Sequence, residues 1–259
     1  MNHKPVKITV ATVTYNAVGV LQRTLDSVAA QDYAHVEHLI IDGNSHDGTL
    51  ALFQHYQENN SRAGVIHEVN AISEPDKGIY DAMNKALAMA TGDYIVFLNA
   101  GDVFHSPDVL TRIAAAAGGM PAVIYGNTDI VDGEGRFVRH RRLAPPRHLT
   151  WHSFLHGMLV CHQAFFARCD IARTTPYNLR YRFSADYDWC IRIMRTAARR
   201  KLPMKNAGII VADYLDGGMT TQNHRRSLME RFRVMAHHYG IITAAAMHLW
   251  FVARAVVKK

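Results

Sequence analysis

The stretch SEPDKGIYDAMNKALAMATGDYIVFLNAGD, residues 73–102, holds a polar loop, a helix-like segment and an apolar run that ends in an acidic turn. Residues 78–90 place apolar side chains along one helix face, and residues 94–98 form a continuous apolar run typical of a buried strand. The turn then brings the carboxylate of Asp102 close behind that strand. Because open α/β sheets bind ligands beyond the carboxyl ends of their strands, this order predicts a ligand site beside Asp102.

Strand-like and helix-like segments also alternate on the N-terminal side of this stretch. Apolar runs at residues 7–15, 36–42 and 65–72 are separated by helix-like segments at residues 19–31 and around 52–56. This order predicts an α/β fold of three layers, α/β/α, in which helices cover both faces of a mostly parallel central sheet.

The second half of the chain has a less regular pattern. We expect strands at residues 122–125, 137–143 and 209–215 and a helix at residues 185–198. From residue 224 onward the pattern is helical. The chain is therefore expected to contain one α/β domain over residues 1–222, followed by a helical region over residues 223–259 that could associate with a membrane.

The composition favours an enzyme over a nucleic-acid-binding protein. With 259 residues and 49% hydrophobic content, the chain is long enough to bury a substantial core. Its net charge of +7 attracts polyanions, but its basic residues are not interleaved with aromatic residues as in single-strand-binding proteins. We therefore expect a polyanionic substrate or an anionic membrane surface as a partner, and no nucleic acid.

Two features indicate a cytoplasmic protein. The three cysteines, Cys161, Cys169 and Cys190, show no C-x-x-C spacing, which disfavours a disulfide framework and a zinc ribbon. The N-terminal residues lack the long apolar core and the cleavage site of a signal peptide. A reducing compartment is consistent with both.

The C-terminal residues 241–257 are apolar, but His248 and Arg254 interrupt them, and a spanning helix needs about 20 apolar residues. One face of the segment is apolar, while Arg254, Lys258 and Lys259 could meet lipid phosphates. Two interpretations stay open: peripheral attachment to the inner face of the cell membrane, and an ordinary helix packed on the domain.

Polar residues occur at the expected strand ends, which a parallel sheet brings to one edge. Asp42 can accept hydrogen bonds from a ribose or a base, Lys77 can offset phosphate charge, and Asp102 can hold a divalent cation. Asn84, within the helix-like segment, is either structural or faces the substrate. The candidates for binding a nucleotide are Thr14, Tyr15, Asn16, Asp42, Lys77, Asn84 and Asn99.

These segments together resemble family 2 glycosyltransferases of the GT-A fold. The likeness rests on Thr14-Tyr15-Asn16, a D-G-x-S-x-D-G-T pattern at residues 42–49, the segment 76–102, and Ser184-Ala185-Asp186-Tyr187-Asp188. It extends over residues 8–220 and is similar to bacterial enzymes of exopolysaccharide assembly, such as colanic acid glycosyltransferases.

The resemblance implies a nucleotide-diphosphate sugar as donor, a divalent metal (Mg or Mn) at an acidic turn, and displacement with inversion at the anomeric carbon. In such enzymes Asp102 matches the last acid of the metal turn. Here Asn99 and Gly101 stand where relatives often carry aspartate, so one carboxylate remains. The metal would then bind more weakly or depend on the diphosphate oxygens.

The resemblance also assigns the acceptor side. Asp186 matches the acid that deprotonates the acceptor hydroxyl, and its place at a helix N-terminus lowers its pKa. Asp188 is either a structural acid or a second group on the acceptor side. His162, in the segment Cys161-His162-Gln163, resembles a residue that lines the acceptor side, and residues 217–220 resemble a loop that closes over the diphosphate.

The sequence thus predicts an inverting glycosyltransferase of bacterial surface polysaccharide synthesis. It would move a sugar from a UDP- or GDP-type donor to a glycan or a polyprenyl-linked acceptor. Two alternatives stay open: a non-catalytic protein of the same fold that binds a nucleotide-sugar or glycan, and a nucleotidyltransferase. The latter would normally show a Gly-rich basic loop after the first strand, where this chain has TYNAVGV.

Overall fold

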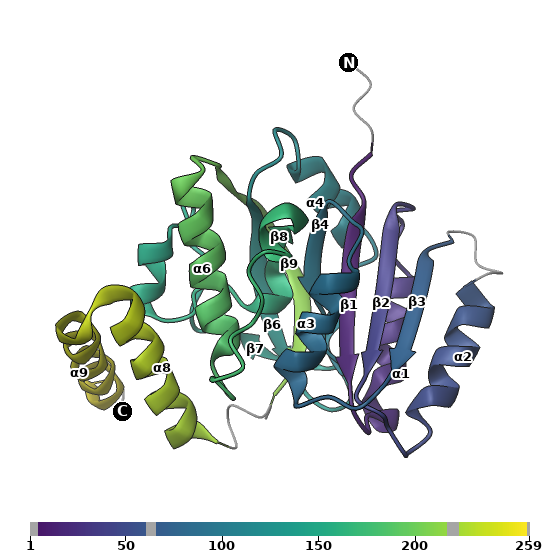
Figure 1. The fold of residues 1–259 in the computed structure, drawn as a ribbon, viewed down its shortest axis with the longest axis horizontal. Helices are drawn as coiled ribbons and strands as arrows, with labels where there is room; N and C mark the ends of the chain where they lie inside the picture. The colour runs from purple at the N-terminus through teal and green to yellow at the C-terminus, as the bar shows by residue number, and fades with distance from the viewer. Residues whose placement is uncertain (1–4, 61–65, 217–222, 258–259) are drawn as a thin grey trace.

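One mixed sheet with helices on both faces makes up the structure (Figure 1), a computed structural model that describes residues 5–60, 66–216 and 223–257. In this part of the chain the strands are β1 (Ile8–Thr14), β2 (Val36–Asp42), β3 (Glu68–Ser73), β4 (Tyr94–Phe97), β5 (Val103–Phe104), β6 (Val123–Val131), β7 (Phe137–His140), β8 (Phe165–Arg168) and β9 (Met204–Leu215). The helices are α1 (Val18–Ala29), α2 (Thr49–Asn60), α3 (Ile79–Met89), α4 (Val109–Ala116), α5 (Cys169–Ala172), α6 (Ala185–Arg199), α8 (His224–Tyr239) and α9 (Ile241–Val257), with 3-10 turns η1 (Trp151–His156) and η2 (His162–Ala164).

The strand order is β3-β2-β1-β4-β8-β6-β9-β5, with β7 paired to β6. β1 lies between β2 and β4 and is parallel to both, and β3 continues this parallel half of the sheet. The register aligns Thr14 with Asp42 and Asp42 with Ser73, so the carboxyl ends of these strands share one edge. Because the chain adds β2 and β3 on one side of β1 and β4 on the other, a topological switch point lies between β1 and β4. The predicted α/β fold with a mostly parallel sheet is confirmed.

The strands β1 and β2 are buried along their whole length because helices cover both faces of the sheet there. Leu39 and Ile41 belong to the large core on the α3 side, whereas Ile40 packs with residues of α1 and α2 on the other side. Alternate residues of β2 therefore serve opposite faces. The helices follow the expected period, and α1 buries the i, i+3, i+4 and i+7 set Leu21, Thr24, Leu25 and Val28.

Some elements differ from the expected ones. The sequence pattern predicts neither β5, which has two residues, nor β8 and α4, whose segments are too short for a clear period. β6 continues through Gly126 to Val131, well beyond the expected end at Tyr125. A Cβ at Gly126 would lie 2.6 Å from the carbonyl oxygen of Ile209, so this glycine lets β6 pass close to β9.

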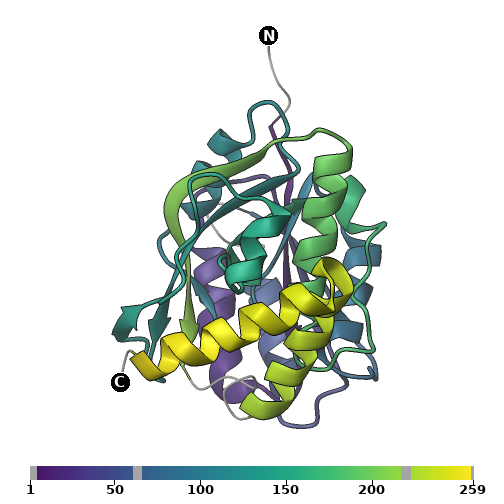
Figure 2. The same ribbon diagram turned by 90° about the vertical axis from the view of Figure 1, so that its left-hand side faces the viewer.

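The helices α8 and α9 lie next to each other beyond α6, at the end of the sheet away from β3 (Figures 1 and 2). Val234 and Met235 of α8 and Ala244 of α9 are buried in the same core as the sheet. Among the helices of the described residues, none is long and apolar enough to cross a membrane.

Candidate functional site

A cleft of about 380 Å³ opens at the carboxyl ends of β1 and β4, at the switch point of the sheet and beside the N-terminus of α3. The lining residues are Val13, Thr14, Tyr15, Ala17, Asp76, Gly78, Ile79, Ala82, Asn99 and Ala100. A second hollow of about 270 Å³ lies next to Asn127 and Asn206, but no ionisable side chain lines it. The first cleft is therefore the candidate site.

Three predicted residues meet in this cleft and leave groups free for a ligand. The ring of Tyr15 is 60% exposed. Thr14 Oγ1 and Asn99 Oδ1 are buried polar atoms without a hydrogen-bond partner among the described residues. Because an unpaired buried polar atom costs free energy, these two atoms fit a ligand that supplies N–H or O–H groups. An exposed aromatic ring beside them fits a planar base.

Asp76 is a cleft residue that the sequence interpretation missed in favour of its neighbour Lys77. Its Oδ1 accepts a hydrogen bond from the backbone N–H of Gly78 at 2.7 Å. Gly43 lies against it, since a Cβ there would come within 2.6 Å of Asp76 Oδ2 and 3.3 Å of the Tyr15 ring. The missing side chain at Gly43 thus allows Asp76 and Tyr15 to approach the end of β2. Lys77 itself is exposed in the same loop.

Asp42, which the sequence analysis places beside a base or ribose, has a completely buried carboxylate at the end of β2. It accepts hydrogen bonds from the backbone N–H of Ser45 at 2.8 Å, from the hydroxyl of Ser45, and from the hydroxyl of Ser73 at 2.6 Å. The backbone N–H of Asn16 in turn donates to Ser45 Oγ at 2.7 Å. Asp42 and Asn16 therefore hold the loops that form the cleft together.

The side chain of Asn84 hydrogen-bonds to the backbone of Tyr177. Its Oδ1 accepts a hydrogen bond from the backbone N–H of Tyr177 at 2.6 Å, and its Nδ2 donates to the Tyr177 carbonyl oxygen at 3.1 Å. Both polar groups of the side chain are thus used to fix a loop against α3. Asn84 therefore has the structural role in this arrangement, which is one of the two that the sequence analysis left open.

Asp102 lies behind the cleft and is 7% exposed. Burial raises its pKa to about 6, although the hydrogen bond from Gln163 and the charges of His162 and Arg23 oppose that rise. Gln163 Nε2 donates to Asp102 Oδ2 at 2.9 Å, while Gln163 Oε1 is buried without a partner among the described residues. Together with Asn99 Oδ1, this gives one carboxylate and two unpaired amide oxygens, which are ligand types that Mg²⁺ and Mn²⁺ accept.

His162 connects the cleft to Asp186. Its Nε2 lies 3.0 Å from Asn99 Nδ2, and its Nδ1 lies 3.4 Å from Asp186 Oδ2. The hydroxyl of Tyr80 donates to the other carboxylate oxygen, Asp186 Oδ1, at 3.2 Å. If the amide of Asn99 donates to Nε2, Nδ1 carries a proton and can donate it to Asp186. His162 of η2 and Tyr80 of α3 therefore meet at the carboxylate of Asp186, at the start of α6.

The pKa of Asp186 is lowered, which is the direction expected from its position at the start of α6. Burial raises the pKa, but the hydrogen bond and charge of His162, the backbone N–H of Tyr187 and the charge of Arg231 outweigh it. The carboxylate is consequently ionised at neutral pH. An ionised and partly buried carboxylate within reach of a cleft can accept a proton from a hydroxyl group.

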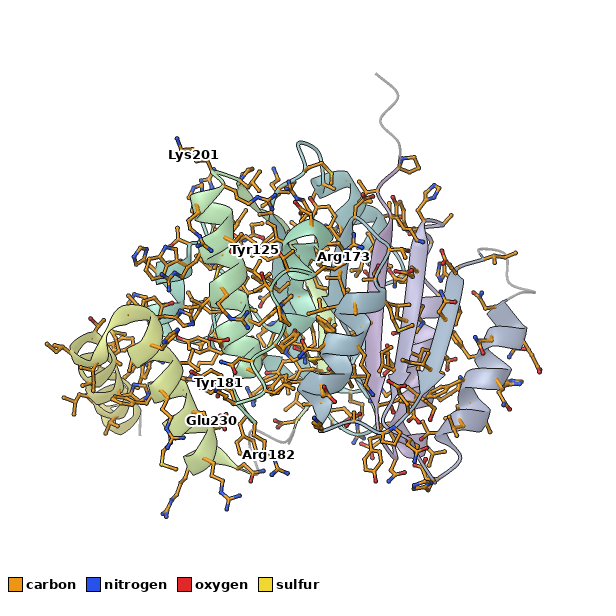
Figure 3. The ribbon with its side chains drawn as sticks, in the orientation of Figure 1. Tyr125, Arg173, Tyr181, Arg182, Lys201 and Glu230 are labelled. Carbon is orange, nitrogen blue, oxygen red and sulfur yellow. The ribbon has the colours of Figure 1, made fainter. Side chains whose placement is uncertain are left out.

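The turn before Asp186 is held from α8 by a residue that the sequence interpretation did not single out. Glu230 accepts hydrogen bonds from the backbone N–H groups of Arg182 at 2.9 Å, Phe183 at 2.7 Å and Ser184 at 3.1 Å. Figure 3 shows Glu230 beside Tyr181 and Arg182, below the start of α6. Its carboxylate thus satisfies backbone donors ahead of a helix that has no side-chain cap.

Asp188 does not contact these groups, although it is only two residues from Asp186. Its side chain is 2% exposed and lies between Arg192 Nε at 2.7 Å and His238 Nε2 at 2.8 Å. It links α6 to α8 as a structural acid, which is the other role that the sequence allowed. The predicted loop at residues 217–220 lies outside the described residues.

Comparisons with known proteins agree on one family. Residues 9–175 match the model of glycosyl transferase family 2. A PGL/p-HBAD biosynthesis glycosyltransferase from Mycobacterium bovis is 31% identical over 251 residues, which cover 95% of this chain and 92% of that protein. These two matches agree with the resemblance that the motifs predicted.

Solved structures agree on the fold. The structure of S. aureus TarS residues 1–349 in complex with UDP-GlcNAc has a TM-score of 0.68 and 16% identity, and the match covers 93% of this chain and 70% of that chain. This chain spans 43% of a longer TarS chain. The mannosyltransferase PcManGT from Pyrobaculum calidifontis, in complex with GDP-Man and Mn²⁺, has a TM-score of 0.64 and 17% identity, over 96% of this chain and 76% of that one.

Proposed function

This chain is a glycosyltransferase that belongs to glycosyl transferase family 2, and from that premise we propose an inverting enzyme of bacterial surface polysaccharide synthesis. It moves a sugar from a nucleotide-diphosphate donor to a glycan or a lipid-linked oligosaccharide. Asp186 is the general base, and the cleft between β1 and β4 takes the donor. The observation that carries this proposal is the contact chain Asn99–His162–Asp186, which joins the cleft to an ionised carboxylate.

In the proposed reaction, the acceptor hydroxyl attacks the anomeric carbon of the donor sugar while its proton passes to Asp186. The bond from that carbon to the diphosphate oxygen breaks, the nucleoside diphosphate leaves, and the single displacement inverts the anomeric centre. A lowered pKa makes Asp186 available but weakly basic, so its effect depends on position. Tyr80 and His162 hold the Asp186 carboxylate in position, because each contacts one of its two oxygens.

The donor contacts follow from the free groups of the cleft. Tyr15 stacks on the base, Thr14 pairs with a hydroxyl or N–H group, and Lys77 offsets diphosphate charge, while the oxygen of Asn99 faces the proposed cation. Asp76 accepts a hydrogen bond from the base or the ribose, the role expected of Asp42 in the sequence analysis. The UDP-GlcNAc and GDP-Man complexes of the two structural neighbours support a nucleotide-sugar donor of the UDP or GDP type.

A divalent cation, Mg²⁺ or Mn²⁺, would be held by Asp102 together with the amide oxygens of Asn99 and Gln163. When bound, it offsets the charge that develops on the leaving diphosphate. The unpaired amide oxygens support this assignment, as does the Mn²⁺ in the mannosyltransferase complex. Because only one ligand is charged, we expect the donor diphosphate to contribute much of the affinity for the cation.

The test combines ligand binding with product analysis. Thermal unfolding with UDP-, GDP- and dTDP-sugars, each with and without Mn²⁺ or Mg²⁺, should raise the Tm for the true donor by mass action. With that donor, Asp186→Asn should lower kcat by about 10²–10⁴-fold while the ligand-induced rise in Tm persists. Asp26→Asn is the matched control, since Asp26 is exposed on α1 and should change neither quantity.

Three outcomes would contradict the proposal. Full transfer activity in a folded Asp186→Asn protein would contradict the role of Asp186 as the general base. A product that keeps the donor's anomeric configuration would contradict an inverting mechanism. Donor binding without turnover of any glycan or lipid-linked acceptor would favour a non-catalytic binding protein instead.

We also propose that residues 223–259 attach the α/β domain, residues 1–222, to an anionic membrane at its cytoplasmic face. On α9 the apolar side chains of Ile241, Ile242, Leu249 and Val252 are 66%, 84%, 73% and 64% exposed. The helix contains no acidic residue, and Arg254 lies over the ring of Trp250 at 4.5 Å. An apolar face beside aromatic and basic groups is typical of an interfacial helix, and it would bring a lipid-linked acceptor to the site.

Vesicle flotation tests this attachment. The protein should float with vesicles of phosphatidylglycerol and phosphatidylcholine, and less with phosphatidylcholine alone. The double substitution Ile242→Asp and Leu249→Asp should abolish flotation, whereas Ile66→Asp, at an apolar residue that is 61% exposed elsewhere, should not. Equal flotation of the double variant and the unchanged protein would place the helix face away from lipid.

A further inference from the structure

A row of side chains in the order His–Asp–Asp–His extends across β7, β6 and β9 to the residue that follows β5, outside the cleft. The register pairs Asp213 of β9 with Asp129 of β6, and Asp129 with His140 of β7, while His105 directly follows β5. His105 Nδ1 lies 2.9 Å from Asp213 Oδ1, and His140 Nδ1 lies 2.9 Å from Asp129 Oδ1. The two carboxylates are therefore neighbours at the centre of the row, with one imidazole on each outer side.

The two carboxylates are directly opposite each other on paired strands, which is a repulsive arrangement for like charges. Water screens that repulsion only weakly, because the side chains of Asp129 and Asp213 are only 4% and 18% exposed. One ligand atom each from His105, Asp129 and Asp213 lies within 4.8 Å of the other two. A cation between the carboxylates would remove the repulsion and use the imidazole as a third ligand.

We propose that His105, Asp129 and Asp213 bind a divalent transition-metal ion of the zinc class. An imidazole nitrogen and two carboxylate oxygens suit this class better than Mg²⁺, which prefers oxygen ligands alone. His140 donates to Asp129 from the outer side and so orients that ligand. The imidazole of His105 is 40% exposed, so an ion can enter from solvent and keep a water molecule as a further ligand.

This site is separate from the cation site proposed at Asp102. The cluster does not include Asp102, whose carboxylate accepts a hydrogen bond from Gln163 in the segment that contains His162. A bound ion would tie the two-residue strand β5 to β6 and β9, and it would thereby restrain the backbone that follows Asp102.

The experiment titrates metal-free, untagged full-length protein with Co²⁺ and Zn²⁺. We expect one Co²⁺ per chain with a visible ligand-field band, and a rise in Tm with Zn²⁺. His105→Gln and Asp213→Asn should each weaken binding at least tenfold, as expected for the loss of a ligand. Asp102→Asn should keep the band, and so should His55→Gln, which removes an exposed histidine from α2.

Two results would overturn this inference. One is the absence of a saturable Co²⁺ equivalent in the unchanged protein, and the other is undiminished binding in both folded variants, His105→Gln and Asp213→Asn. If the band vanishes in Asp102→Asn but persists in His105→Gln, the ion belongs to the donor turn and the new site does not exist. Sugar transfer by His105→Gln is measured in parallel, so failure of this site leaves the glycosyltransferase proposal untouched.

Discussion

Replacing His38 should change how the stability of this protein depends on pH. The imidazole is completely buried on β2, where Nε2 lies 2.9 Å from Thr12 Oγ1 and Nδ1 lies 2.9 Å from the hydroxyl of Tyr56. Burial, with a smaller contribution from the charge of His67, lowers the pKa of His38 from 6.5 to about 3. The substitution His38→Gln keeps a polar side chain at this position but removes the titrating group.

The size of the effect follows from proton linkage. Between pH 6.5 and about 3, the unfolded chain binds a proton at residue 38 that the folded chain does not bind. Stability therefore falls as the pH falls, by about 1.4 kcal/mol for each pH unit below 6.5. At pH 4.5 this one group should cost about 3 kcal/mol, a large share of the about 5–15 kcal/mol that stabilises a typical domain.

Urea unfolding at several pH values from 7.5 to 4.5 measures the difference. His38→Gln is expected to be less stable than the unchanged protein at pH 7.5, because packing at a buried position is disturbed. That deficit should shrink by about 2–3 kcal/mol at pH 4.5, because only the unchanged protein loses the His38 contribution. Carboxylates with lowered pKa values weaken both proteins in acid alike, so they cancel in the difference.

A matched variant tests the cause. His55→Gln removes a histidine that is exposed on α2, and its stability should follow that of the unchanged protein at every pH. Parallel curves for His38→Gln and the unchanged protein would refute the reasoning, because they would mean that the buried imidazole binds its proton equally well in the folded and unfolded chains.

Three further substitutions test contacts around the site. Glu230→Gln should lower kcat and change Tm little, because the turn ahead of the proposed base loses its anionic acceptor. A kcat equal to that of the unchanged protein would show that this carboxylate does not position the turn. Gly43→Ala should weaken donor binding in a thermal-shift titration, because its Cβ would lie 2.6 Å from Asp76 Oδ2. The loss of stability should be small, since the Asp76 side chain can move aside. An unchanged affinity for the donor would show that Gly43 does not shape the cleft. Gly126→Ala should cost about 1–3 kcal/mol in urea unfolding, because its Cβ would meet the fixed Ile209 carbonyl oxygen at 2.6 Å. A stability unchanged within error would contradict that estimate.

The parallel half of the fold could be predicted because its strands are buried on both faces and are therefore continuous apolar runs. Residues 36–42 were expected as a strand and form one, with the same ends. β5 could not be found in this way, since two residues form no pattern, and its place depends on pairing with the distant Asp213. The same limit applies to β8, which pairs with β4 and β6.

The site was predictable where a residue's location follows from the end of a strand, as for Thr14 and Asn99, which both line the cleft. The site was not predictable where a residue's role depends on which neighbouring group forms a hydrogen bond with its side chain. Asp42 looks like a ligand in the sequence, but Ser45 and Ser73 occupy its carboxylate. Glu230 looks like one of many helical surface acids, and only the packing of α8 on α6 brings it to the backbone of residues 182–184.

The position of Glu230 on α8 also decides how the chain can be shortened. A protein that ends at Gly240 would lose the exposed apolar face of α9 and one buried core residue, Ala244, but it would keep Glu230 and His238. A protein that ends at residue 222 would lose both, and the turn before Asp186 would lose its acceptor for three N–H groups. The first truncation would remove the proposed membrane contact together with the packing of Ala244. The second would also release the turn before the proposed base, and the resulting loss of activity could be mistaken for a need for lipid.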